Sequence, residues 1–134
     1  MNVLIKQARI VAPHSGNHGR IADIFIEDGI IRKIEDTITV ENTKVLQAEN
    51  LHVSIGWMDV FANFSDPGLE QNESIDTGAA SAAAGGFTHV MLVPNTSPVI
   101  SAKAQVEYIL KKAEGHSVSI YPIGAVTQNA KGSN

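Results

Sequence analysis

Residues 77–93 read TGAASAAAGGFTHVMLV and contain, in order, a helix, a turn and a strand. Alanine dominates residues 77–84, and alanine has the highest intrinsic helix propensity. Gly85 and Gly86 end this helix, because glycine readily adopts the backbone conformation that follows a helical C-terminus. Residues 87–93 are mostly apolar, which is typical of a strand buried on both faces of a parallel sheet. The stretch therefore predicts one helix–strand unit of an α/β fold.

The segments on either side extend this unit to β-α-β-α-β. Residues 51–64 form a long apolar run that predicts one strand, and residues 66–68, Asp-Pro-Gly, end it. Residues 101–114 carry apolar side chains at helical spacing before a terminating glycine. Residues 118–126 predict a third strand. Strands joined through helices in this way form a parallel sheet with right-handed crossovers.

Residues 1–50 have a different character. Residues 21–34 predict a hairpin, because Asp28-Gly29 lies between two apolar runs and glycine tolerates positive φ. Two further segments, residues 3–11 and 45–48, are strand candidates. We therefore predict a small antiparallel sheet ahead of the parallel one.

The composition excludes several classes of function. The chain has 134 residues and a formal net charge of −4, with no long run of one sign. A nucleic-acid-binding surface needs clustered Lys and Arg, so we expect no nucleic-acid partner. No apolar run approaches the roughly 20 residues of a membrane helix, and the N-terminus lacks the pattern of a signal peptide, so we expect no membrane association. The absence of cysteine excludes disulfides and fits a cytoplasmic protein.

The end of the first strand of the parallel sheet is the natural place to look for chemistry. In parallel α/β barrels, catalytic groups lie at the C-terminal ends of the strands. Here that region is residues 59–68, which read DVFANFSDPG. A hydrolase that activates water with a metal needs His or carboxylate ligands. This strand end offers Phe61 and Asn63 instead.

Four motifs stand in order along the second part of the chain. They are VSIGWMD at 53–59, DPG at 66–68, TGAASAAAGGFT at 77–88 and PNTSPV at 94–99. Together they resemble the N-terminal third of dihydroorotases, the cyclic amidohydrolases of pyrimidine synthesis, and the resemblance covers almost the whole chain. It implies an α/β fold with a small antiparallel β-sandwich subdomain over residues 1–52. Residues 53–134 would then be the first βαβαβ part of a (β/α)8 metal-dependent hydrolase barrel.

The resemblance also implies what should stand at the first strand end. The family's strand ends in Asp-x-His-x-His-x-Arg, in which the two His bind zinc and the Arg helps to bind the substrate carboxylate. Asp59 matches this pattern, but Phe61 and Asn63 occupy the two zinc positions. Ser65 occupies the arginine position. Asn95 matches a residue that contacts substrate in the family, so it is the one substrate-binding candidate.

These differences predict that the first-strand site has lost its zinc. Phe61 has no ligand atom, and the amide of Asn63 is a weak, neutral oxygen donor. Ser65 lacks a cation that would pair with a carboxylate, an interaction worth about 1.5–3 kcal/mol. We therefore expect no catalytic residue and no cofactor at this site, although zinc serves the active family. The expected protein is dihydroorotase-like and non-catalytic, with a structural or assembly role.

Two alternatives remain open. The protein could be an active cyclic amidohydrolase whose metal is held by residues of later strands, or a module that binds ligand without turnover. As partners, the resemblance suggests further copies of the same protein and aspartate carbamoyltransferase, with which inert family members assemble. A complete barrel takes about 250 residues. We therefore expect the chain to be part of a longer protein.

The remaining polar residues have structural interpretations. No pair of the five histidines has the i, i+2 spacing that would aim two imidazoles at one metal from a strand. Asp59 is expected to make a structural hydrogen bond near the strand end. Asp66, Glu70 and Glu73 precede a helix, whose N-terminus favours acids electrostatically. The lysines of residues 101–114 are predicted to form a solvated helix face.

Overall fold

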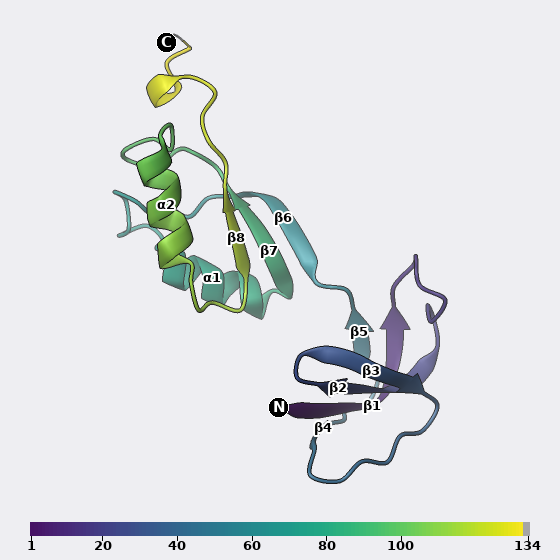
Figure 1. Cartoon of the computed structure of the whole chain (residues 1–134). Coiled ribbons are helices and arrows are strands. Elements are labelled where there is room, and N and C mark those ends of the chain that lie inside the picture. Colours follow the sequence, from purple (N-terminus) through teal and green to yellow (C-terminus); the bar gives the residue numbers. More distant parts are fainter. Residues whose placement is uncertain (133–134) are drawn as a thin grey trace. The chain divides into compact units, whose positions relative to one another are not determined.

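The computed structural model describes residues 1–132. The chain forms two units, Met1–Ile55 and Gly56–Asn134, each with its own sheet (Figure 1). Among the described residues, neither helix reaches the length and apolarity that a membrane span requires.

The first unit contains one five-stranded sheet with the order β3-β2-β1-β4, in which β5 also pairs with β1. Its strands are β1 (Asn2–Val11), β2 (Ile21–Glu27), β3 (Ile30–Glu35), β4 (Lys44–Leu46) and β5 (His52–Ser54). The predicted hairpin is confirmed, because β2 and β3 pair antiparallel around a turn in which Asp28 and Gly29 have φ values of 49° and 78°. Apolar side chains form two small buried clusters, one around Leu4 and one around Ile24.

The prediction of a purely antiparallel sheet is wrong. β1 is antiparallel to β2 but parallel to both β4 and β5. A tight hairpin dictates the direction of β3 only, and the longer connection after β3 lets the chain return along β1 in the same direction. β1 is long enough for both neighbours, since β4 pairs with residues 3–5 and β5 with residues 9–11. The second layer of the expected sandwich stays a prediction.

A buried carboxylate organises the middle of this sheet. Asp23 of β2 is 0% exposed, pairs with Lys6, and accepts hydrogen bonds from the backbone N–H groups of Gln7 at 2.9 Å and Ile38 at 2.8 Å. Gln7 has a φ of 48°, in the left-handed region, where β1 bulges. Burial alone would raise the pKa of Asp23, but the hydrogen bonds from Lys6, Ile38 and Gln7 outweigh it and lower the pKa to about 2. The carboxylate is therefore ionised inside the protein.

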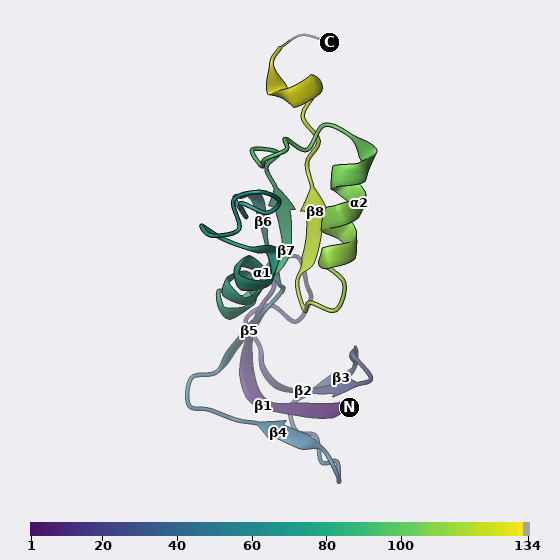
Figure 2. The same cartoon turned by 90° about the vertical axis from the view of Figure 1, so that its left-hand side faces the viewer.

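The second unit is a three-stranded parallel sheet in the order β6-β7-β8. Its elements are β6 (Trp57–Ala62), α1 (Ile75–Ala84), β7 (Phe87–Leu92), α2 (Lys103–Lys112), β8 (Ser119–Pro122) and the short 3-10 helix η1 (Gln128–Ala130). Both α-helices lie on the same side of the sheet (Figure 1 and Figure 2). They enclose one core, in which Ile75 and Ile109 pack with Val90 and Leu92. The predicted β-α-β-α-β order is confirmed.

The apolar run of residues 51–64 contains two strands, so the prediction of one strand is wrong. β5 belongs to the first sheet and β6 to the second. Between them, Gly56 lies so close to Thr88 that a Cβ atom at this position would come within 2.2 Å of the Thr88 side chain. Hydropathy along the chain reveals neither this contact nor the division of the run between two sheets.

Helix α1 begins at Ile75, two residues before the alanine-rich stretch. Ser74 is the N-cap: its hydroxyl accepts from the Thr77 N–H at 3.2 Å, and the Thr77 hydroxyl accepts from the Ser74 N–H at 3.1 Å. Such a reciprocal pair satisfies two N–H groups that have no partner within the helix. The small residues of the helix allow close packing, since a Cβ at Gly78 would lie 2.6 Å from the ring of Phe64.

Candidate functional site

The candidate site is the C-terminal end of β6 together with the loop that follows it. Phe61, near the end of the strand, is 75% exposed, and Asn63 is also exposed. Ala62 between them is buried in the core beneath the helices. Ser65 is 9% exposed, so its hydroxyl is nearly enclosed. The strand end thus presents an aromatic ring and a neutral amide to its surroundings.

Asp59 supports the backbone of this strand end. Its Oδ1 atom accepts a hydrogen bond from the Phe61 N–H at 2.9 Å. The register between β6 and β7 shifts between Asp59 and Ala62, so regular ladder bonds are interrupted there. The carboxylate takes up a backbone donor where the ladder is irregular, which confirms the structural hydrogen bond expected of Asp59.

Asn95 lies in the loop after β7 and is exposed. The backbone of this loop contacts the loop after β6: the Ser97 N–H donates to the Pro67 carbonyl oxygen at 2.9 Å. Gly68 has a φ of 95°, and a Cβ there would lie 1.7 Å from the Ser97 carbonyl oxygen. The two strand-end loops therefore touch through main-chain atoms at a point where only glycine fits. The role of Asn95 in binding a substrate stays a prediction.

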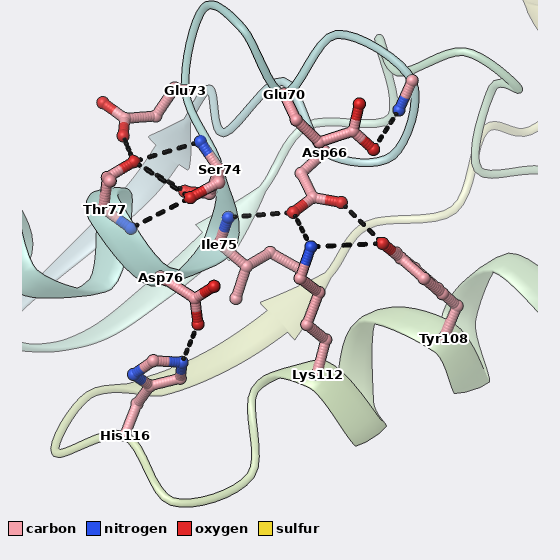
Figure 3. A network of polar contacts seen from close by, with 11 residues as sticks. Asp66, Glu70, Glu73, Ser74, Ile75, Asp76, Thr77, Tyr108, Lys112 and His116 are labelled. Atoms are coloured by element: carbon pink, nitrogen blue, oxygen red, sulfur yellow. Dashed lines mark hydrogen bonds and ion pairs between the residues drawn. The ribbon is translucent and has the colours of Figure 1, made fainter.

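The most densely connected group near the site is the carboxylate of Asp66, which is 0% exposed (Figure 3). Its Oδ2 atom accepts from Lys112 Nζ at 2.6 Å and from the Ile75 N–H at 3.1 Å. Its Oδ1 atom accepts from the Tyr108 hydroxyl at 3.0 Å. One side chain thereby joins the loop after β6 to the first residue of α1 and to two residues of α2.

The charges of this network are mutually stabilised. Burial alone would raise the pKa of Asp66, but hydrogen bonds from Lys112, the Ile75 N–H and Tyr108 outweigh it and hold the pKa below its ordinary value. The hydrogen bond to Asp66 in turn raises the pKa of Lys112 above its ordinary value. Both groups are therefore ionised at neutral pH, and they form a partly enclosed ion pair.

Asp66 lies beside a helix N-terminus, as predicted, whereas the prediction that Lys112 lies on a solvated helix face is wrong. The Lys112 side chain is 30% exposed and paired, and it does not belong to a solvated face. Tyr108 and Lys112 are four residues apart, so they lie on the same face of α2. The spacing could have indicated that Tyr108 and Lys112 lie side by side, but it did not identify Asp66 as the group that both contact.

The other acids of the loop and helix also make local contacts (Figure 3). Glu70 accepts from the Gly68 N–H at 2.8 Å, and Glu73 accepts from the Thr77 hydroxyl. Asp76, in the first turn of α1, lies 3.1 Å from Nε2 of His116. These carboxylates thus fasten the loop and the helix start.

The chemistry of the strand end does not fit zinc. Protein zinc sites use Cys, His and carboxylate ligands. Phe61 offers no such atom, and Asn63 and Ser65 offer only neutral oxygens. Across residues 1–132, no group of three or more His, Cys, Asp or Glu side chains is arranged to hold a metal ion.

A pocket of about 200 Å³ lies beside the strand end. Its walls are mainly apolar and include Phe64 and Phe87, while Asp59, Asn63 and Glu73 are among its polar lining residues. It lies against the helix-covered side of the sheet, since Ala62 and Val90 also line it and belong to the core. Its two carboxylates already accept hydrogen bonds from Phe61 and Thr77, as described above. Both carboxylates therefore also support the local structure of the strand end and of the helix start.

Comparisons with known proteins agree on one family. The family model described as "Dihydro-orotase-like" matches residues 52–134. The chain is 42% identical over 134 residues to a dihydroorotase of Citrifermentans bemidjiense, with 98% of this chain and 31% of that protein covered. It is 44% identical over 131 residues to a dihydroorotase of Acetivibrio thermocellus, with 97% of this chain and 30% of that protein covered. The chain thus spans about a third of the length of these curated relatives.

Solved structures show a similar fold. L-hydantoinase (dihydropyrimidinase) from Arthrobacter aurescens matches with a TM-score of 0.73 and 23% identity, over 95% of this chain and 28% of that chain. A second amidohydrolase structure matches with a TM-score of 0.56 and 16% identity, over 92% of this chain and 32% of that chain. The mixed α/β fold is consistent with the N-terminal part of an amidohydrolase barrel.

Proposed function

This chain belongs to the Dihydro-orotase-like family, and we propose that it is part of a protein of pyrimidine biosynthesis whose first barrel strand has lost its zinc site. In this proposal the protein has a structural role. The observation that carries the proposal is the simultaneous presence of Phe61, Asn63 and Ser65 at the three functional positions of that strand. Zinc lowers the pKa of a bound water to near 7 in hydrolases, and none of these side chains can help to hold it.

The contacts around the strand end support the proposal that the ligand atoms are lost while the hydrogen bonds that hold the strand end and its loop are kept. Asp59 still accepts the Phe61 N–H, and Asp66 is fully engaged. The Phe61 ring and the Asn63 amide lie outside the core that Ala62 and the two helices form within residues 1–132. The substitutions therefore remove ligand atoms without removing the contacts that shape the loop.

We extend the proposal to the architecture of the whole protein. Residues 53–134 would be the first part of a (β/α)8 barrel, and residues 1–52 part of a β-sandwich subdomain completed by chain outside this sequence. The similarity to L-hydantoinase over 95% of this chain supports this architecture. It would be contradicted by a structure of the full-length protein in which β6 and β8 are not flanked by further parallel strands.

The proposed structural role is assembly with further copies of the same protein and with aspartate carbamoyltransferase. The choice of these partners rests on the resemblance to inert family members. The open edges of the described three-stranded sheet, β6 and β8, are assigned above to further strands of the same barrel, so they are not the proposed contact surface. Co-purification of the full-length protein with the carbamoyltransferase of its own organism tests the assembly role, and two separate peaks in size-exclusion chromatography would contradict it.

The catalytic part of the proposal is tested by metal content and turnover. The full-length natural protein is purified beside the Acetivibrio thermocellus dihydroorotase, zinc is measured by mass spectrometry, and ring opening of dihydroorotate is followed. We expect the relative to carry zinc and to turn over, and the present protein to show neither. Stoichiometric zinc together with turnover comparable to the relative would overturn the proposal.

Two other functions lead to different results in the same experiments. An active amidohydrolase with metal held by later strands predicts zinc and turnover despite Phe61 and Asn63. A binding module predicts heat on titration with dihydroorotate or orotate, no turnover, and loss of that heat in Asn95→Ala. The retained Asn95 favours the binding module, whereas Ser65 disfavours it because no cation replaces the arginine at that position.

A further inference from the structure

The loop that carries Asn95 is tied to the loop after β6 in two ways. The first tie is direct, because the Ser97 N–H donates to the Pro67 carbonyl oxygen at 2.9 Å. The second tie runs through α2, which begins shortly after the loop and brings Lys112 to the carboxylate of Asp66 at 2.6 Å. Asp66 directly precedes Pro67 in the chain, so both ties meet at one turn.

We propose that Asp66 is a positioning residue, whose buried carboxylate holds the turn after β6 against α2 and thereby fixes the conformation of residues 94–100, including Asn95. The proposal concerns the alignment of the two strand-end loops. It applies whether or not the protein binds or turns over a substrate, so it goes beyond the proposed function and does not depend on it.

The turn and the neighbouring loop are in close main-chain contact. At Gly68 the main chain lies so close to the Ser97 carbonyl group that a Cβ would come within 1.7 Å of its oxygen. A displacement of the turn toward the loop therefore displaces Ser97 as well. A displacement away from the loop breaks the hydrogen bond that Ser97 donates to Pro67.

The loop is also braced internally, which lets it respond as one piece. The Thr96 hydroxyl donates to the Pro98 carbonyl oxygen at 2.8 Å, and the Ile100 N–H donates to the Pro94 carbonyl oxygen at 3.3 Å. Thr96 is 5% exposed and Ile100 is 0% exposed, so both ends of the brace are enclosed. Asn95 lies inside this braced segment, and its backbone position follows from how the segment is anchored.

The carboxylate is well suited to anchor the turn, because all its contacts come from other segments. Lys112 and Tyr108 belong to α2, and the Ile75 N–H belongs to α1. Three donors on two oxygens restrict both the position and the rotation of the side chain. A neutral side chain of the same shape keeps the volume but loses the attraction to the Lys112 ammonium group.

The test is hydrogen–deuterium exchange on the full-length protein, resolved by mass spectrometry of peptides. Lys112→Met removes the cation, Asp66→Asn removes the anion and keeps the shape, and Lys112→Arg restores a cation. The matched control is Lys111→Met, one residue away on the exposed side of α2. We expect Lys112→Met and Asp66→Asn to accelerate exchange at residues 66–70 and 94–100 by about tenfold or more, as for a local opening that the anchor no longer opposes.

Selectivity distinguishes positioning from general stabilisation. Exchange in β1 and β2 should stay unchanged, Lys112→Arg should recover protection at residues 94–100, and Lys111→Met should behave as the natural protein. Unchanged exchange at residues 94–100, acceleration there that only matches the uniform loss of stability measured by urea denaturation, or acceleration confined to residues 66–70 would overturn the proposal. If Lys112→Met does not give folded protein, Asp66→Asn decides the question by the same criterion.

Discussion

Lys112 Nζ lies 2.6 Å from Asp66 Oδ2, although the two residues are separated by 46 positions in the chain. The Asp66 carboxylate is fully buried, and the lysine is mostly covered. Removing one member of such a pair leaves an uncompensated charge in a poorly solvated place. The ion pair therefore has consequences for stability that an exposed pair lacks.

Lys112→Ala should destabilise the protein by about 3 kcal/mol, the lower end of the range for breaking an enclosed pair, because the lysine keeps some contact with water. Lys111→Ala, on the exposed side of the same helix, should change stability by less than about 0.5 kcal/mol. Urea denaturation of the full-length protein measures both. Equal effects of the two substitutions would show that the Asp66 contact does not stabilise the fold.

Stability should fall in acid partly because of Asp23. Its pKa is about 2 in the folded protein and 3.8 in the reference state, so its contribution is fully present above pH 4 and is lost as pH falls toward 2. The contribution amounts to about 2 kcal/mol. Asp23→Asn should lower stability at pH 7 and flatten the dependence between pH 4 and 2. An unchanged slope in the variant would contradict this assignment.

Gly68→Ala should be more damaging than Gly86→Ala. Both glycines have positive φ, 95° and 83°, so an alanine is strained at either position. At Gly86 nothing lies within 4 Å of the added Cβ, whereas at Gly68 it would meet the Ser97 carbonyl oxygen at 1.7 Å. We expect a loss of about 1–2 kcal/mol at Gly86 from strain alone. The loss at Gly68 should exceed it by at least about 1 kcal/mol, and thermal melting of the two variants makes the comparison.

Ser74→Ala should destabilise helix α1 by about 1 kcal/mol, because the Thr77 N–H loses its acceptor. Ser74→Asp should retain most of the stability, since a carboxylate can accept the same hydrogen bond and favours a helix N-terminus. The measurement is the midpoint of chemical denaturation of each variant, compared when the slope of unfolding free energy against denaturant concentration is unchanged. A Ser74→Asp variant as unstable as Ser74→Ala would rule out capping as the source of the effect.

Zinc should not stabilise the full-length protein if the proposed loss of the site is right. A ligand that binds only the folded state at 100 times its Kd adds about 2.7 kcal/mol. The Citrifermentans bemidjiense dihydroorotase, stripped with chelator and then reloaded, should show a rise in Tm. The present protein should melt at the same temperature with chelator and with zinc, and a matching rise would reverse the conclusion drawn from Phe61 and Asn63.

The local order of the second unit could be predicted from the sequence because its signals are local. The alanine-rich stretch ending at Gly85 marks α1, and the apolar run after it marks β7. The same signals failed at residues 51–64, where two strands of different sheets read as one. Gly56, where the two strands separate, lies against Thr88, a residue far away in the chain.

Some features of the candidate site could likewise be predicted from the sequence, and others could not. The absence of ligand atoms at Phe61, Asn63 and Ser65 could be read directly, because it concerns residue identity. The pairing of Asp66 with Lys112 could not be read, because helical spacing separates apolar from polar faces but does not distinguish a solvated lysine from an enclosed one. Likewise, the sequence around Gln7 does not indicate that its backbone N–H donates a hydrogen bond to the carboxylate of Asp23.

The contrast between Phe61 and Asp66 bears on how such a protein can diverge. Within residues 1–132, Phe61 is tied through its backbone N–H to Asp59, whereas the Asp66 side chain is tied to three donors in two helices. A substitution at Phe61 therefore changes the side chain that the strand end presents and leaves the contacts of Asp66 in place. A substitution at Asp66 instead removes contacts that join the loop after β6 to both helices at once.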